Sequence, residues 1–126
     1  MINTAQFGLL ILLFLFLLLH FLILIKIIPY NLVWGGRLKT DKEMYQFEIF
    51  SILINSLFVI VILVQANFLI IDIPRRIITY ALWLMTGLFL LNTLGNAISK
   101  NKLEQRLFTP VTILLAIFSS ILALAN

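Results

Sequence analysis

The sequence predicts an all-α membrane protein, a single bundle of four transmembrane helices in an up-down-up-down arrangement. Apolar residues fill 63% of the 126 positions and charged residues only 11%, whereas soluble domains carry about 45–50% and about 25%. The apolar residues gather in four segments. Each is long enough to cross a hydrocarbon core of about 30 Å, which takes about 20 helical residues. Short connections hold most of the charged residues between these segments.

The spans are expected near residues 7–28, 48–71, 76–98 and 104–125, so that one transmembrane domain occupies 1–126. Pro29 is predicted to end the first helix, because proline removes a backbone donor and clashes with the preceding turn. We expect this segment to be a retained span and not a signal peptide. Its N-terminal flank has no basic residue, and no small-residue cleavage site follows it.

The second helix has a recognisable start, since Thr40 and Glu43 match a capping box. From there the helical pattern continues to about residue 71, a length of about 46 Å. Because this exceeds the hydrocarbon thickness, residues 41–47 are expected to stand outside the membrane, with Glu48 at its boundary.

The later helices have less regular starts. Asp72 is predicted to cap the third helix, and Pro74 suits its first turn. A fourth helix beginning at Pro110 would reach only about 24 Å, short of a crossing. We therefore predict a start near Lys102 or Leu103 and a kink at Pro110.

The distribution of basic residues predicts the orientation. Seven of the nine lie in or beside the first and third connections: Lys26, Arg37, Lys39, Lys42, Lys100, Lys102 and Arg106. Only Arg75 and Arg76 flank the second connection. The positive-inside rule then makes the first and third connections cytoplasmic and places both termini outside.

The same rule suggests the membrane partners. Arg37, Lys39, Lys100 and Lys102 are expected to contact anionic lipid headgroups. The compact chain without sorting motifs indicates an integral protein of the bacterial plasma membrane. A homo-oligomer or another membrane protein is the expected protein partner.

Polar residues from several helices converge at one depth of the membrane. His20, Glu48, Asn55, Asn92 and Asn96 all lie within about 12 Å of the cytoplasmic helix ends. Glu48 and Asn55 share one face of the second helix, and Asn92 and Asn96 share one face of the third. These five residues are the candidate ligand-binding or ion-binding residues.

Each candidate also has a purely structural interpretation. An intramembrane carboxylate such as Glu48 indicates a functional site, but Glu48 also lies close enough to the surface to pair with a lysine: Lys26, Lys42 or Lys100. The asparagines are predicted either to tie helices together or to line a site. His20 belongs to the residue type that titrates near neutral pH, or it donates one hydrogen bond to a neighbouring helix.

Several classes of protein are not expected. The absence of cysteine excludes disulfides and thiolate metal sites. One histidine and few carboxylates give no nucleophile, base and orienting group, so we predict no enzyme. No ligand spacing indicates a metal, and no glycine-rich loop indicates a nucleotide or other cofactor. Nucleic acid is not an expected partner, because the basic tract 37–42 also contains Asp41.

Two functions are compatible with the sequence. The first is binding or moving a small ion or solute through the polar cluster in the cytoplasmic half of the bundle. The alternative is a non-catalytic accessory, assembly or immunity-type membrane protein that docks on a partner. The alternative is suggested by the outer half of the helices, which is almost entirely apolar. A lipid-modifying enzyme at the inner leaflet is the least favoured.

Overall fold

The computed structural model describes residues 1–32 and 37–126, and the regular structure in these ranges is entirely helical. The long helices are α1 (Ile2–Leu24), α2 (Asp41–Gln65), α3 (Arg75–Ala97) and α4 (Thr109–Ala125). A 3-10 turn, η1 (Tyr30–Leu32), follows α1, and a π-helical turn, η3 (Glu104–Phe108), leads directly into α4. Four helical stretches are long and apolar enough to cross a membrane: α1, α2, α3 and Glu104–Ala125. The predicted all-helical class with four candidate spans is therefore confirmed.

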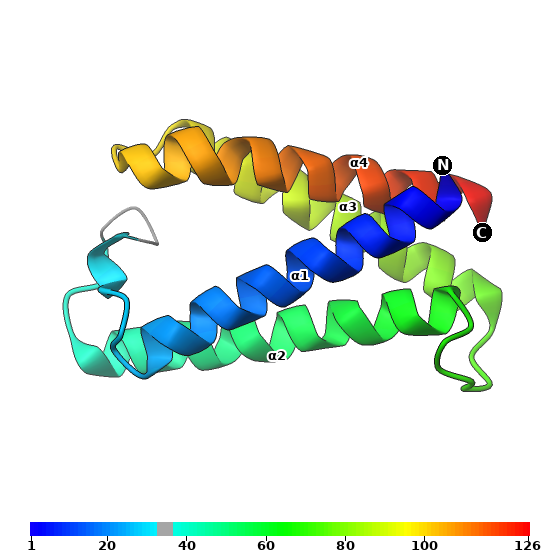
Figure 1. Ribbon diagram of the computed structural model, residues 1–126, viewed down its shortest axis with the longest axis horizontal. Coiled ribbons are helices and arrows are strands. Elements are labelled where there is room, and N and C mark those ends of the chain that lie inside the picture. The colour runs from blue at the N-terminus through cyan, green and yellow to red at the C-terminus, as the bar shows by residue number, and fades with distance from the viewer. Residues whose placement is uncertain (33–36) are drawn as a thin grey trace.

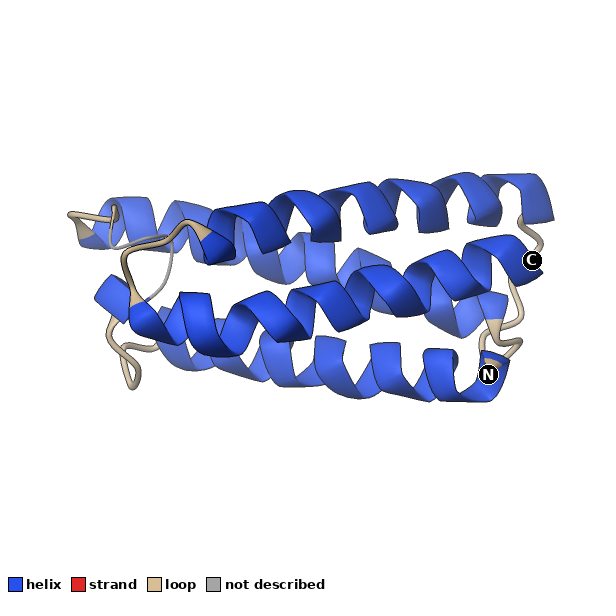
Figure 2. Cartoon of the chain, turned by 90° about the horizontal axis from the view of Figure 1, so that it is seen from above, coloured by secondary structure: helices blue, strands red, loops and turns tan. Residues whose placement is uncertain are grey.

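The two ends of the molecule differ in what they contain. Both termini and the connection 66–74 lie at one end, which we call the terminal end (Figure 1). The connections 25–40 and 98–103 lie at the opposite end, and the view from above agrees (Figure 2). This opposite end, the basic end, holds the seven clustered lysines and arginines of the sequence.

Two helices end earlier than their apolar patterns predict. Lys26 and Asn67 adopt left-handed conformations, with φ of 66° and 63°. Beyond them, the Ile27 amide donates to the Leu22 carbonyl at 2.9 Å, and the Phe68 amide donates to the Leu63 carbonyl at 2.9 Å. These bonds close Schellman motifs, which satisfy the last carbonyls of a helix. The predicted ends near residues 28 and 71 are thus wrong, because the apolar residues continue past the helix ends.

The starts of α2 and of the last helical stretch follow the predictions, whereas α1 begins at Ile2 and not near residue 7. The Thr40 hydroxyl accepts a hydrogen bond from the Glu43 amide at 3.2 Å, as the capping box predicts. Asp72 does not cap α3, which begins directly after Pro74 without a side-chain cap. The last helical stretch begins at residue 102, as predicted, and its wide π-helical turn lies just before Pro110.

Hydrogen bonds between side chains join the four helices into two pairs. Between α1 and α2, the Gln6 amide donates to Gln65 at 2.8 Å near the terminal end, and His20 meets Glu48 near the basic end. Between α3 and α4, Thr86 donates to Ser119 at 2.9 Å, and Thr93 donates to Thr112 at 2.9 Å. Each of these bonds joins neighbours in the chain, so α1–α2 and α3–α4 are two hairpin pairs.

Apolar contacts hold the two pairs together. Phe16 of α1 packs edge-on against Phe108 of the π-helical turn, with ring centroids 5.7 Å apart. Gly8 of α1 lies directly under the ring of Phe118 in α4. Towards the terminal end the four helices share one apolar core, which includes Leu9, Ile62, Leu82, Met85 and Leu122. This half of the bundle is closed by packed aliphatic side chains.

Candidate functional site

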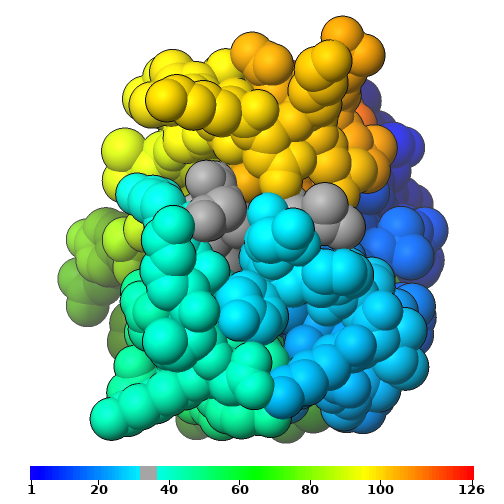
Figure 3. All heavy atoms as spheres, turned by 90° about the vertical axis from the view of Figure 1, so that its left-hand side faces the viewer, coloured from blue at the N-terminus to red at the C-terminus, as the bar shows by residue number. Residues whose placement is uncertain are grey.

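A cavity of about 930 Å³ opens between the two hairpin pairs at the basic end. All four long helices and the π-helical turn contribute to its lining. The helices α2 and α3 contact each other less than the pairs α1–α2, α1–α4 and α3–α4 do, and residues of both line the cavity together with residues of α1 and α4. Figure 3 looks onto this end, with residues near 25–45 below and residues near 100–108 above.

Four of the five candidate residues line this cavity: His20, Asn55, Asn92 and Asn96. They come from α1, α2 and α3, as their matching depths predict. Glu48 is not a lining residue. Its side chain is fully buried, behind the imidazole of His20.

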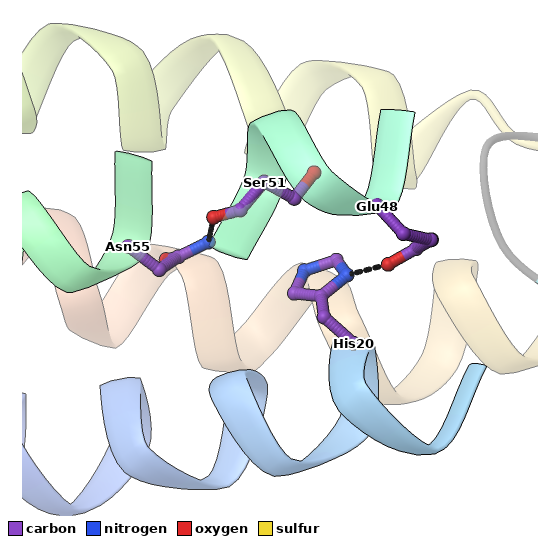
Figure 4. Close-up of polar contacts among 4 residues, drawn as sticks. All are labelled: His20, Glu48, Ser51 and Asn55. Atoms are coloured by element: carbon purple, nitrogen blue, oxygen red, sulfur yellow. Dashed lines mark hydrogen bonds and ion pairs between the residues drawn. The ribbon is translucent and has the colours of Figure 1, made fainter. Parts of the chain in front are cut away.

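His20 and Glu48 form a close pair between α1 and α2. The imidazole Nδ1 lies 2.5 Å from the Glu48 Oε2, and the exposed fractions of the two side chains are 15% and 0%. Nδ1 and Oε2 share one hydrogen bond. The second ring nitrogen lies on the side of the ring towards Ser51 and Asn55 (Figure 4). The buried carboxylate thus orients an imidazole whose other nitrogen faces the cavity.

The structure shows a partner for Glu48 that was not considered from the sequence, the imidazole of His20. Lys26 instead donates to Asp41 at 2.5 Å, outside the spanning segments. The hydrogen bond with Asp41 holds the pKa of the Lys26 ammonium above its ordinary value. That ion pair links the end of α1 to the start of α2 at the surface.

The asparagines do not tie helices together in this structure. The Asn55 amide donates to the Ser51 carbonyl one turn earlier in the same helix, at 2.8 Å (Figure 4). Asn92 and Asn96 make no side-chain hydrogen bond to any other residue that the structure describes. Their amide groups therefore face the cavity with hydrogen-bonding capacity that a ligand or water can use.

The mouth of the cavity carries charges that sequence reasoning did not assign to the site. Arg37 and Lys100 line it and are exposed, whereas the Glu104 carboxylate lines it and is nearly buried. The Ser99 hydroxyl donates to this carboxylate at 3.4 Å. Glu104 follows Asn96 closely in the sequence, just after the short connection 98–103, and this proximity is the signal that could have found it.

Two phenylalanines close the inner end of the cavity. Phe58 of α2 and Phe89 of α3 meet edge to face, with centroids 5.4 Å apart. Both rings are buried, and the apolar core continues beyond them to the terminal end. The cavity is therefore closed towards the terminal end.

The lining of the cavity offers hydrogen-bonding groups and basic groups. Among the described residues, no three histidine, aspartate or glutamate side chains gather where they could hold a metal. The lining instead combines amides, an imidazole and two basic groups with phenyl rings. Comparison of the chain with protein-family models, with curated proteins and with solved structures finds no match.

Proposed function

We propose that this protein is a non-enzymatic membrane protein that binds, and in a second step moves, a small solute through the cavity at its basic end. The observation that carries the proposal is the convergence of polar groups on one sizeable hollow. Asn92 and Asn96 offer amides that no described residue uses, and His20 presents an oriented imidazole. Cavities of roughly 300–1,000 Å³ with a few convergent polar groups are typical ligand sites.

Movement across the membrane would require the two hairpin pairs to shift against each other. Side-chain hydrogen bonds hold each hairpin pair together internally. Between the two hairpin pairs the contacts are apolar, with Phe58 against Phe89 and Phe16 against Phe108. Apolar contacts between rigid units slide at lower cost than buried hydrogen bonds break. The Phe58–Phe89 contact is then the inner gate, and the arrangement corresponds to a state open at the basic end.

We further propose that the helices cross the membrane in alternating directions, with the basic end in the cytoplasm and both termini outside. The excess of basic residues at one end supports this orientation. Because the chain has no cysteine, a single Asn126→Cys variant gives a unique label site. An impermeant thiol reagent should label it in intact cells and should label Lys102→Cys only after lysis. The reverse pattern would contradict the orientation.

Flux through sealed proteoliposomes tests the proposal directly. Proton, sodium and potassium flux and the uptake of small organic anions are compared for the wild type and Gly95→Trp. Gly95 lines the cavity, and a side chain added there meets open space, so the tryptophan fills the cavity without disturbing the helix. The matched control is Gly87→Trp, on the same helix, also open and outside the cavity.

Flux or binding that Gly95→Trp abolishes and Gly87→Trp preserves supports the proposal. Equal activity in the two variants, both shown to be folded, contradicts it. A substitution of Glu48 by glutamine adds a second readout, since it removes the charge that orients His20. Loss of transport with retained binding in Glu48→Gln is the expected pattern for a residue behind the lining.

One observation favours the second candidate function, docking on a partner membrane protein. Asn92 is exposed on α3, beside Leu91 and Gly95, so that this face offers an intramembrane amide and a site of close backbone approach. A partner helix lying against α3 would then cover the cavity from the side. Gly95→Trp would disrupt such a complex too, but the flux assay on the purified protein would find no activity in the wild type.

A further inference from the structure

The lining of the cavity changes character with depth. On α3, the lining asparagines Asn96 and Asn92 lie nearer the basic end and Phe89 lies deeper, while Ser99 lies just beyond the end of the helix. On α2, Asn55 lies nearer the basic end and Phe58 about one turn deeper, and the exposed Phe50 lies at the outer edge of the lining. Charged groups at the mouth, amides in the middle and phenyl rings at the inner end form a polarity gradient along one axis.

A hydrated inorganic ion uses only the outer part of such a cavity. The inner part is lined by phenylalanine and leucine side chains, which favour the apolar portion of a ligand through the hydrophobic effect. They are Phe16, Phe58, Leu88, Phe89 and Leu115. A ligand that fills the whole gradient has a polar head at the basic end and an apolar chain directed towards Phe58 and Phe89.

The charges at the mouth select the sign of the head. Arg37 and Lys100 contribute two exposed cationic groups. Among the described lining residues, the carboxylate is that of Glu104, which is only 6% exposed and accepts the Ser99 hydroxyl. Arg37 and Glu104 each have a further interaction besides. A carboxylate or phosphate head would meet both cations, and the arginine fork suits its oxygens.

The cavity is also open towards the lipid. Among its lining residues on α2 and α3, Phe50 and Leu91 have exposed fractions of 60% and 64%. Ile98, near the basic end of α3, is 81% exposed. In a membrane these side chains face lipid. A molecule dissolved in the leaflet at the basic end therefore has a direct lateral path into the cavity.

From these four observations we propose that the ligand is a single-chain anionic amphiphile that enters from the leaflet at the basic end. Its head lies between Arg37 and Lys100, its polar neck contacts Asn92 and Asn96, and its chain ends against Phe58 and Phe89. This proposal rests on the ligand-binding function proposed above and adds the chemical class of the ligand.

Native mass spectrometry of the purified full chain in a mild maltoside detergent tests the class. The probes are lysophosphatidic acid, lysophosphatidylcholine with the same acyl chain, and inorganic phosphate. They separate an anionic amphiphile from a zwitterionic amphiphile and from a free anion. We expect lysophosphatidic acid to bind with one molecule per chain, at least about tenfold tighter than either alternative.

A pair of double variants tests the role of the mouth. Arg37→Gln with Lys100→Gln removes the two lining cations, and Lys39→Gln with Lys102→Gln removes the same charge from the same end outside the cavity. We expect the double variant Arg37→Gln with Lys100→Gln to weaken lysophosphatidic acid binding at least about tenfold, as the loss of a charge-assisted hydrogen bond predicts. The double variant Lys39→Gln with Lys102→Gln should change the affinity for lysophosphatidic acid by less than about twofold, because those side chains act only through screened surface charge.

The outcomes separate this proposal from the function on which it rests. Equal binding of the two lysolipids, or equal loss in the two double variants, would overturn the anionic amphiphile. If Gly95→Trp then still abolishes the flux of another solute, the proposed function stands and only the ligand class fails. Tight binding of inorganic phosphate alone would likewise replace the amphiphile by a soluble anion.

Discussion

The His20–Glu48 pair makes the sharpest prediction about the stability of the bundle. The Glu48 side chain is fully buried, and its Oε2 lies 2.5 Å from the imidazole. Removing one partner of a buried pair costs about 3–5 kcal/mol, because it leaves a desolvated charge poorly compensated. We expect His20→Leu to cost about 3 kcal/mol, at the low end of that range, because Glu48 keeps a further interaction.

The accompanying variants follow from the same reasoning. Glu48→Gln keeps an acceptor for the imidazole and loses only the charge, so it should cost about 1 kcal/mol. The double variant His20→Leu with Glu48→Leu removes both polar groups and should be more stable than His20→Leu alone. The cycle made of His20→Leu alone, Glu48→Leu alone and the double variant should therefore give a coupling energy of about 2 kcal/mol or more.

Unfolding of the purified protein by sodium dodecyl sulfate in mixed micelles measures these free energies. Phe21→Leu is the control, since Phe21 neighbours His20 on α1 but is exposed. A cost below about 1 kcal/mol for His20→Leu, with additive single variants, would refute the structural pairing. The contact between α1 and α2 would then not depend on this pair.

Three further predictions concern positions outside the site. Gly8→Ala should destabilise the fold, because the added Cβ would lie 2.5 Å from the Phe118 ring, whereas Gly87→Ala should stabilise the fold by up to about 1 kcal/mol through helix propensity. Thermal unfolding in detergent measures the difference, and equal effects of the two substitutions would contradict the packing of α1 against α4. Thr40→Ala should cost about 1 kcal/mol in the same unfolding experiment by removing the cap of α2. The pKa of Lys26 is raised by its hydrogen bond to Asp41, so the pair stabilises the fold below the ordinary value of 10.5 and this contribution is lost as the pH rises through the raised pKa. A melting-temperature profile taken into the alkaline range should show that loss in the wild type and not in Lys26→Met, although the pair is half-exposed and its effect correspondingly small.

The depth of the candidate residues was predictable, but their partners were not. Distance along a helix converts residue number into depth, which is why His20, Asn55, Asn92 and Asn96 were expected near one another. The residue count along each helix does not say how α1 and α2 are rotated against each other. That rotation brings the Glu48 carboxyl group against the His20 imidazole, and it brings Lys26 against Asp41 at the surface.

The ends of α1 and α2 illustrate a second limit of the sequence. Hydropathy continues unbroken past Lys26 and Asn67, so the pattern predicts a longer helix in both cases. The left-handed residue that stops each helix is a backbone choice, made because it lets the last carbonyls find donors in the turn. Asn67 is a common residue at such a position, but Lys26 is not, and nothing in its neighbourhood marks it.

The sequence alone determined the class of protein, because burying so many apolar residues in so short a chain requires a lipid solvent. It also determined the number of helices, since each span needs its own apolar segment and charged connections separate them. The cavity was decided only in the tertiary structure. Whether Asn92 and Asn96 face a neighbouring helix or an open space depends on how far α2 and α3 separate. That separation follows from side-chain packing between distant segments, Phe58 against Phe89 and Phe16 against Phe108, which no local pattern in the chain encodes.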